Sequence, residues 1–103
     1  MKNKINELFD ILYDATARID EKDDAAIYLA KYPTSEVLNK LVIFASNPNE
    51  NKIVLASLGE SIGEIMIAKN KFERDIIEKL TPLAKQEALG IIHGKKPEWL
   101  RNK

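Results

Sequence analysis

The chain contains no cysteine and only one histidine among its 103 residues. The absence of cysteine excludes disulfide bonds, thiolate nucleophiles and thiolate metal ligands, and it is typical of a reducing compartment such as the cytoplasm. The histidine, His93, belongs to no E-x-x-H pattern and has no sequence partners for a catalytic triad. We therefore expect a cytoplasmic protein that is not an enzyme, with no catalytic residue, no metal site and no cofactor.

Net charge and long apolar runs are also missing. Sixteen basic residues balance sixteen acidic ones, so no overall field attracts nucleic acid or an anionic membrane. A membrane-spanning helix needs roughly 20 apolar residues, and Glu60 and Glu64 interrupt the longest candidate. The beginning, MKNKINELFD, has no apolar stretch typical of a secretory signal. We expect neither nucleic acid nor a membrane among the partners.

A short segment near the C-terminus carries the one basic cluster, formed by Lys95, Lys96, Arg101 and Lys103. The cluster has no interleaved aromatic residues on a structured surface and no recognition helix, so it is weak evidence for a nucleic-acid interface. Trp99 in the same segment has two interpretations. It is either an exposed anchor for a partner or a side chain that packs back over the preceding helix.

The apolar residues that are present recur at steps of three and four, which is the period of an amphipathic helix. Start and stop signals such as Tyr32-Pro33 and Thr81-Pro82 divide this pattern. Five helices are predicted over about residues 4–19, 22–31, 50–68, 72–79 and 82–93, and a sixth between Thr34 and Ser46. Gly94 is expected to end the last of them in a left-handed turn, and PEWLRNK to add one more turn. No segment alternates as a strand does, so we expect one all-α domain, residues 1–103, that is monomeric before it binds a partner.

The stretch LASLGESIGEIMI, residues 55–67, belongs to the most apolar of these helices. Apolar residues cover most of its circumference, so it is expected to be central and to contact neighbours on several sides. Ala56, Gly59 and Gly63 fall on one side and form a smooth strip. Because each interior glycine costs roughly 1 kcal/mol of helix stability relative to alanine, the strip predicts that a neighbouring backbone packs closely there. A glycine-rich phosphate loop is the alternative, but its spacing is absent.

A narrow polar stripe runs along the same helix and consists of Ser57, Glu60, Ser61 and Glu64. Its two carboxylates have three interpretations: an ordinary solvated surface, contact with a partner, or metal and acid–base chemistry. The third needs further ligands that the sequence does not supply. The first two remain open.

The N-terminal half contains a second acidic group. Residues 1–50 hold six Lys and Arg against nine Asp and Glu, and Asp20, Glu21, Asp23 and Asp24 cluster where the second helix is expected to begin. Negative charge at a helix N-terminus is favoured by the helix dipole, which is a sufficient structural explanation. The alternative is a surface for a basic partner.

The run A-x-L-G-E-x-I-G from Ala56 to Gly63, followed by a turn and a helix with Ile76, Ile77 and Leu80, resembles the HEAT-like helical repeats; Ala88-Leu89-Gly90 is a fainter echo. The resemblance covers roughly residues 37–92. It implies about six helices in irregular antiparallel pairs around the central helix, and a protein that binds another macromolecule. An adaptor or regulatory subunit that docks on a cellular protein is one function that it implies.

The whole chain also resembles small immunity proteins of bacterial polymorphic-toxin systems, including contact-dependent growth inhibition. The residues that carry this resemblance are the GES-x-GEI centre and the LTPLAKQEALGII and KPEW segments near the end. It implies a protein that binds one cognate toxin domain, for example a nuclease, and blocks it. An acidic surface would suit a basic toxin, so the expected partner-binding residues are Asp20, Asp23, Asp24, Glu60 and Glu64.

Overall fold

The computed structural model describes residues 3–101, which form six α-helices, two short 3-10 helices and no strand. The prediction of an all-α chain is therefore confirmed for the described residues. None of these helices is both long enough and apolar enough to cross a membrane. The elements are α1 (Lys4–Tyr13), α2 (Ile19–Tyr28), η1 (Leu29–Lys31), α3 (Ser35–Ala45), α4 (Lys52–Lys69), α5 (Arg74–Lys79), α6 (Pro82–Lys95) and η2 (Pro97–Leu100).

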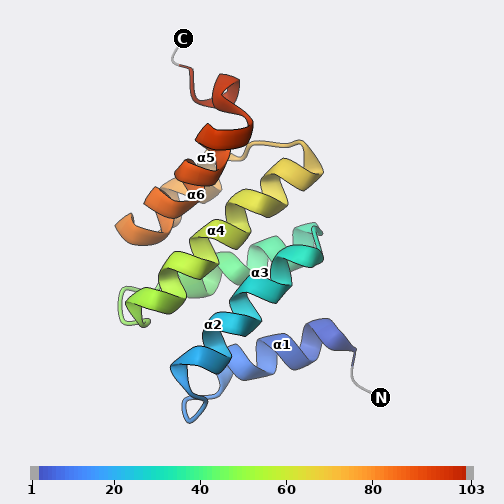
Figure 1. Cartoon of the computed structure of the whole chain (residues 1–103), viewed down its shortest axis with the longest axis vertical. Helices are drawn as coiled ribbons and strands as arrows, with labels where there is room; N and C mark the ends of the chain where they lie inside the picture. The colour runs from blue at the N-terminus through green and yellow to red at the C-terminus, as the bar shows by residue number, and fades with distance from the viewer. Residues whose placement is uncertain (1–2, 102–103) are drawn as a thin grey trace.

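The helices form two layers (Figure 1). Helices α2, α4 and α6 lie side by side in the nearer layer, with α4 in the middle. Helix α3 lies behind α4, α5 lies behind α6, and α1 packs against α2. The described chain extends over 45 × 29 × 20 Å, and its two ends lie at opposite ends of the long axis.

Helix α4 is central, as its composition predicts, because it contacts α2, α3 and α6. Its apolar side chains supply a large part of the core, and the fully buried ones are Val54, Leu58, Ile62, Ile65 and Met66. Each buried aliphatic side chain of this size contributes roughly 1.5–3 kcal/mol relative to exposure. The position of α4 is thus fixed from three sides, and its fourth side is left for solvent or a partner.

The glycine strip of α4 is where α6 packs, which confirms the prediction of close approach. A Cβ atom added to Gly59 would lie 2.2 Å from the carbonyl oxygen of Ala84, and one added to Gly63 would lie 2.9 Å from that of Ala88. Real Cβ atoms are essentially never this close to another heavy atom. The two helix backbones therefore meet only because these positions have no side chain.

Helices α2, α4 and α6 run in the same direction. Gly59 lies against Ala84 and Gly63 against Ala88, so residue numbers rise together along α4 and α6. The contacts between α2 and α4 rise in the same way, from Asp23 with Ser57 to Ala26 with Ser61. Parallel neighbours cannot be joined by a tight turn, so α3 and α5 return the chain behind the nearer layer. The predicted similarity of this arrangement to HEAT-like helical repeats stays a prediction.

Two predicted helix ends differ from the structure in the segment between α1 and α2. Helix α1 stops at Tyr13 instead of about residue 19, because the Asp14 carboxylate accepts hydrogen bonds from the Thr16 amide (2.9 Å) and hydroxyl (2.7 Å). Such local side-chain bonds compete with helix formation. Helix α2 begins earlier than expected, at Ile19, where Glu21 accepts a bond from the Arg18 amide (3.0 Å).

The other residues that were expected to begin or end helices do so, with one exception. Thr34 caps α3 through the Val37 amide (3.1 Å), and Thr81 caps α6. Gly94 does not form the predicted left-handed turn: α6 continues to Lys95, and no described glycine has a positive φ. The left-handed residue is Asn70 (φ 55°), which ends α4. Asparagine tolerates this conformation because its short polar side chain bonds locally.

The segment after α6 forms the predicted extra turn, η2. Its Trp99 is half-buried, packs against the core and lies 5.8 Å, centroid to centroid, from Phe72. The packing interpretation of Trp99 is therefore confirmed. Lys103 of the basic cluster lies outside the described residues.

Candidate functional site

A groove opens on the nearer layer, where α2 and α6 flank the narrow polar stripe of α4. Its volume is about 480 Å³. We call it the acidic groove, and it is lined by Ile27, Ala30, Lys31, Glu60, Ser61, Glu64, Ala68 and Ile91. Residues from α2 and η1 form one wall, α4 forms the floor, and Ile91 of α6 lies on the other side. Three helices that are far apart in the sequence are thus needed to build it.

The two serines of the polar stripe fasten α2 to α4 and are not part of a solvated surface. Ser61 is only 3% exposed, and its hydroxyl donates a 2.6 Å hydrogen bond to the Ala26 carbonyl. The hydroxyl of Ser57, also buried, donates to the Asp23 carboxylate. The two hydrogen bonds hold Asp23 and Ala26 of α2 beside α4.

Three other carboxylates lie near enough to Glu60 to act on its pKa, and we call the four residues the carboxylate cluster: Asp23, Glu60, Glu64 and Glu87. Partial burial raises the pKa of Glu60, and the negative charges of Glu87, Asp23 and Glu64 raise it further. These neighbours come from α6, α2 and α4 respectively. Glu64 has a cation of its own, since the ammonium of Lys95 lies 3.2 Å from its carboxylate. The structure therefore concentrates negative charge around Glu60.

The structure divides the five predicted site residues among three places. It brings Asp23, Glu60 and Glu64 together in the carboxylate cluster. Asp24 points instead into a second groove between α1 and α2, which is also lined by Lys4, Asp14, Glu21 and Tyr28.

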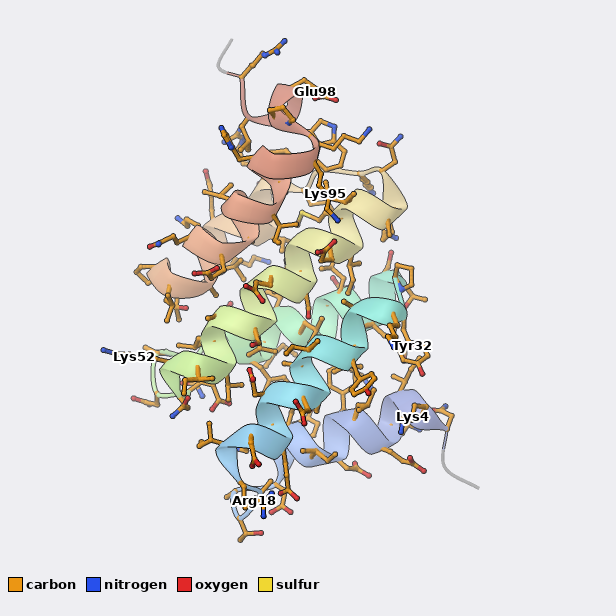
Figure 2. The ribbon with its side chains drawn as sticks, in the orientation of Figure 1. Lys4, Arg18, Tyr32, Lys52, Lys95 and Glu98 are labelled. Carbon is orange, nitrogen blue, oxygen red and sulfur yellow. The ribbon has the colours of Figure 1, made fainter. Side chains whose placement is uncertain are left out.

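Asp20 belongs to neither groove. It forms an exposed ion pair with Arg18, whose guanidinium lies 3.0 Å from its carboxylate. Hydrogen bonding from Arg18 lowers the pKa of Asp20. This pair sits at the beginning of α2, far along the visible face from Lys95 (Figure 2). Because Arg18 compensates part of its negative charge, Asp20 would attract a basic partner less strongly than an unpaired carboxylate would.

Sequence reasoning missed Glu87, which completes the carboxylate cluster from α6. Its position between Ala84 and Ala88, the two small residues that fit the glycine strip, is the signal that could have found it. Ala84 packs against Gly59 and Ala88 against Gly63, and this pairing brings Glu87 near the polar stripe of α4. The spacing of the two alanines becomes informative only once they are paired with the glycine strip, which the sequence of α6 alone does not indicate.

Three exposed isoleucines lie on α2 and α4, the helices that carry Asp23 and Glu60. Ile19 and Ile27 lie four residues before and after Asp23, so all three share one side of α2, and the two isoleucines are 40% and 49% exposed. Ile53 is 58% exposed and lies two helical turns before Glu60, on the same side of α4. Exposed apolar patches that are rimmed by polar residues are typical of protein–protein interaction sites.

Nothing in the described part of the chain resembles a metal centre: no three of its His, Asp and Glu residues are grouped to hold an ion. His93 is exposed in the last turn of α6. Neither a protein-family model, nor a curated protein, nor a solved structure matches this chain.

Proposed function

We propose that the protein is an immunity protein that binds a cognate toxin domain in the cytoplasm and neutralises it by occlusion. The observation that supports this proposal best is the carboxylate cluster, which three helices assemble at the edge of an open groove and which exposed isoleucines flank. The carboxylates would accelerate and orient the approach of a basic toxin surface. The isoleucines would supply apolar area to bury in the complex.

A rigid surface is an advantage in this role, because ordering a flexible surface on binding reduces affinity. The close packing of Gly59 against α6 and the hydrogen bond from Ser61 to α2 fix the three helices of the nearer layer relative to one another. The carboxylate cluster is therefore preorganised. Inhibition would require only that the bound protein covers the toxin's active site or the surface that it uses on its target.

An adaptor or regulatory subunit is the second candidate. It is favoured by the parallel arrangement of α2, α4 and α6, which offers one continuous face, as in helical repeat proteins that bind macromolecules. Such a protein would use the same face on a cellular partner. The two candidate functions use the same face of the protein and differ in the partner that binds to it.

The deciding experiment is coexpression of the chain with the product of the adjacent upstream gene. We expect the two proteins to purify as a complex and the chain to restore growth when the neighbour is toxic. Charge reversal in the carboxylate cluster, Glu60→Lys or Glu87→Lys, should weaken the complex about tenfold each, which corresponds to about 1.4 kcal/mol. Glu78→Lys on α5, in the other layer, is the matched control and should leave binding unchanged; Asp24→Lys tests the second groove.

A toxic neighbour that neither binds nor is neutralised would contradict the immunity function. The adaptor would then be pursued by crosslinking from the groove face in cells. Binding that is equally sensitive to Glu60→Lys and to Glu78→Lys would show that the effect of charge is not local to the groove.

A further inference from the structure

The acidic groove is lined by charges of both signs, and they follow one another along its length. The hydrogen bonds that Ser57 and Ser61 donate to α2 join residues that are 34 and 35 positions apart in the sequence. By the same offset, Lys31 at the end of η1 lies about 8 Å beyond Glu60 along the α4 axis, since a helix rises roughly 1.5 Å per residue. Ile27, which also lines the groove, falls between the two charges.

The three side chains are exposed, so a partner has access to them. Glu60 forms no ion pair among the described residues, and Ile27 is 49% exposed. The Lys31 ammonium lies over the ring of Tyr28, 4.7 Å from its centroid, and both of these residues are exposed. Cation–π contacts at exposed sites are weak, so Lys31 can exchange this contact for a charge-assisted hydrogen bond to a carboxylate.

We propose that this face of the nearer layer binds a second copy of the chain, packed face to face with the two α4 helices antiparallel. A two-fold axis that passes between Glu60 and Lys31 places Glu60 of each copy opposite Lys31 of the other. The same axis brings the two Ile27 side chains together. Interfaces of two-fold dimers are self-complementary in this way, and apolar contact flanked by opposite charges is the usual composition of a protein interface.

The order of the charges favours a second copy over ligands of other kinds. A ligand of one charge sign is attracted by Glu60 or by Lys31 and repelled by the other. An apolar segment would cover both without replacing their hydration, which is costly. A second copy supplies both charges at the required spacing, because the symmetry repeats the same pattern in reverse. The balanced net charge of the chain adds no long-range repulsion between copies.

The face is large enough for such a dimer. The described chain measures 45 × 29 Å in the plane of Figure 1, and a stable interface buries roughly 800 Å² on each partner. Exposed Ile19 and Ile53 extend the apolar surface beyond Ile27. The dimer would cover the same face as the proposed toxin complex, so the toxin and the second copy would compete. The expectation of a monomer before partner binding then holds only in dilute solution.

Sedimentation equilibrium of the whole chain tests this proposal in the absence of any toxin. We expect a monomer–dimer equilibrium with a dissociation constant below about 100 μM. Glu60→Lys or Lys31→Glu alone should weaken the dimer by at least about tenfold, because each substitution places like charges opposite each other. The double variant with both reversals should dimerise within about threefold of the unmodified chain. Glu78→Lys on α5 is the matched control and should leave dimerisation unchanged.

A dimer weaker than this limit, or no dimer, would overturn the proposal. So would a dimer that neither single reversal weakens, or losses that the double variant fails to restore. Growth into larger assemblies with rising concentration would also count against it, because a two-fold interface closes on itself. A monomeric chain that still binds the toxin through Glu60 would refute self-association and leave the immunity function standing.

Discussion

At the scale of single residues, the glycines of α4 and α6 have opposite surroundings. Gly59 faces the α6 backbone at a distance that no Cβ allows, whereas Gly90 has open space where its Cβ would be. We predict that Gly59→Ala lowers the free energy of unfolding by about 2 kcal/mol, because overpacking costs more than the gain in helix propensity. Urea denaturation monitored by circular dichroism measures this.

Gly90→Ala is the matched control and should raise the free energy of unfolding by roughly 0.5–1 kcal/mol, since it gains helix propensity without a clash. The same sign for both substitutions would contradict the packing of α4 on α6.

Glu60 makes stability depend on pH. Its folded-state pKa is raised above the ordinary value of 4.5 by partial burial and by neighbouring carboxylates, so the native state binds its proton more tightly than the unfolded state does. The contribution of Glu60 to stability therefore falls as the pH rises from the unfolded pKa through the folded one. We predict that Glu60→Gln is more stable than the unmodified chain at neutral pH, by well under about 1 kcal/mol because solvent screens the charges.

This difference between Glu60→Gln and the unmodified chain should vanish below about pH 4, where Glu60 is protonated in both states. Denaturation curves at several pH values measure it, with Glu78→Gln as the control. If Glu60→Gln were instead less stable than the unmodified chain at neutral pH, with the loss disappearing as the pH falls, Glu60 would be stabilised as a carboxylate, contrary to the expectation.

At the scale of elements, the hydrogen bond from Ser61 to Ala26 fixes α2 against α4. We predict that Ser61→Ala lowers the free energy of unfolding by about 1 kcal/mol, the usual net value of such a bond. Ser46→Ala is the matched control, because the buried Ser46 hydroxyl has no hydrogen-bond partner among the described residues. Removing it should be neutral or stabilising, and equal losses for the two variants would contradict the role given to Ser61.

At the scale of the whole molecule, charge is balanced overall but unevenly distributed, with sixteen basic and sixteen acidic residues and the carboxylate cluster on one face. Steering of a basic toxin must then come from that face and not from net charge. We predict that the association rate measured by stopped flow falls as salt rises from 10 mM to 150 mM, and that the double variant Glu60→Gln, Glu87→Gln shows a weaker salt dependence. An association rate that is independent of salt would contradict electrostatic steering.

Most of the elements could be predicted from the sequence because their signals are local. The cap at Thr34, the start at Thr81-Pro82 and the period of three and four depend on residues within one or two turns. The errors are also local: the turn at Asp14 ended α1 early, and Gly94 stayed helical. At each of these two positions a helical and a non-helical local conformation compete, and their free energies differ by only about 1 kcal/mol.

The sequence by itself determined that this chain is helical, that α4 is central, and that something must pack on Gly59 and Gly63. Which helix packs there was decided only by the tertiary structure, and with it the position of Glu87 beside Glu60. Ser57 meets Asp23 across 34 positions of sequence, and no local periodicity encodes such a pairing. The site depends on the order in which three parallel helices pack, and that order follows from the shapes of their buried faces.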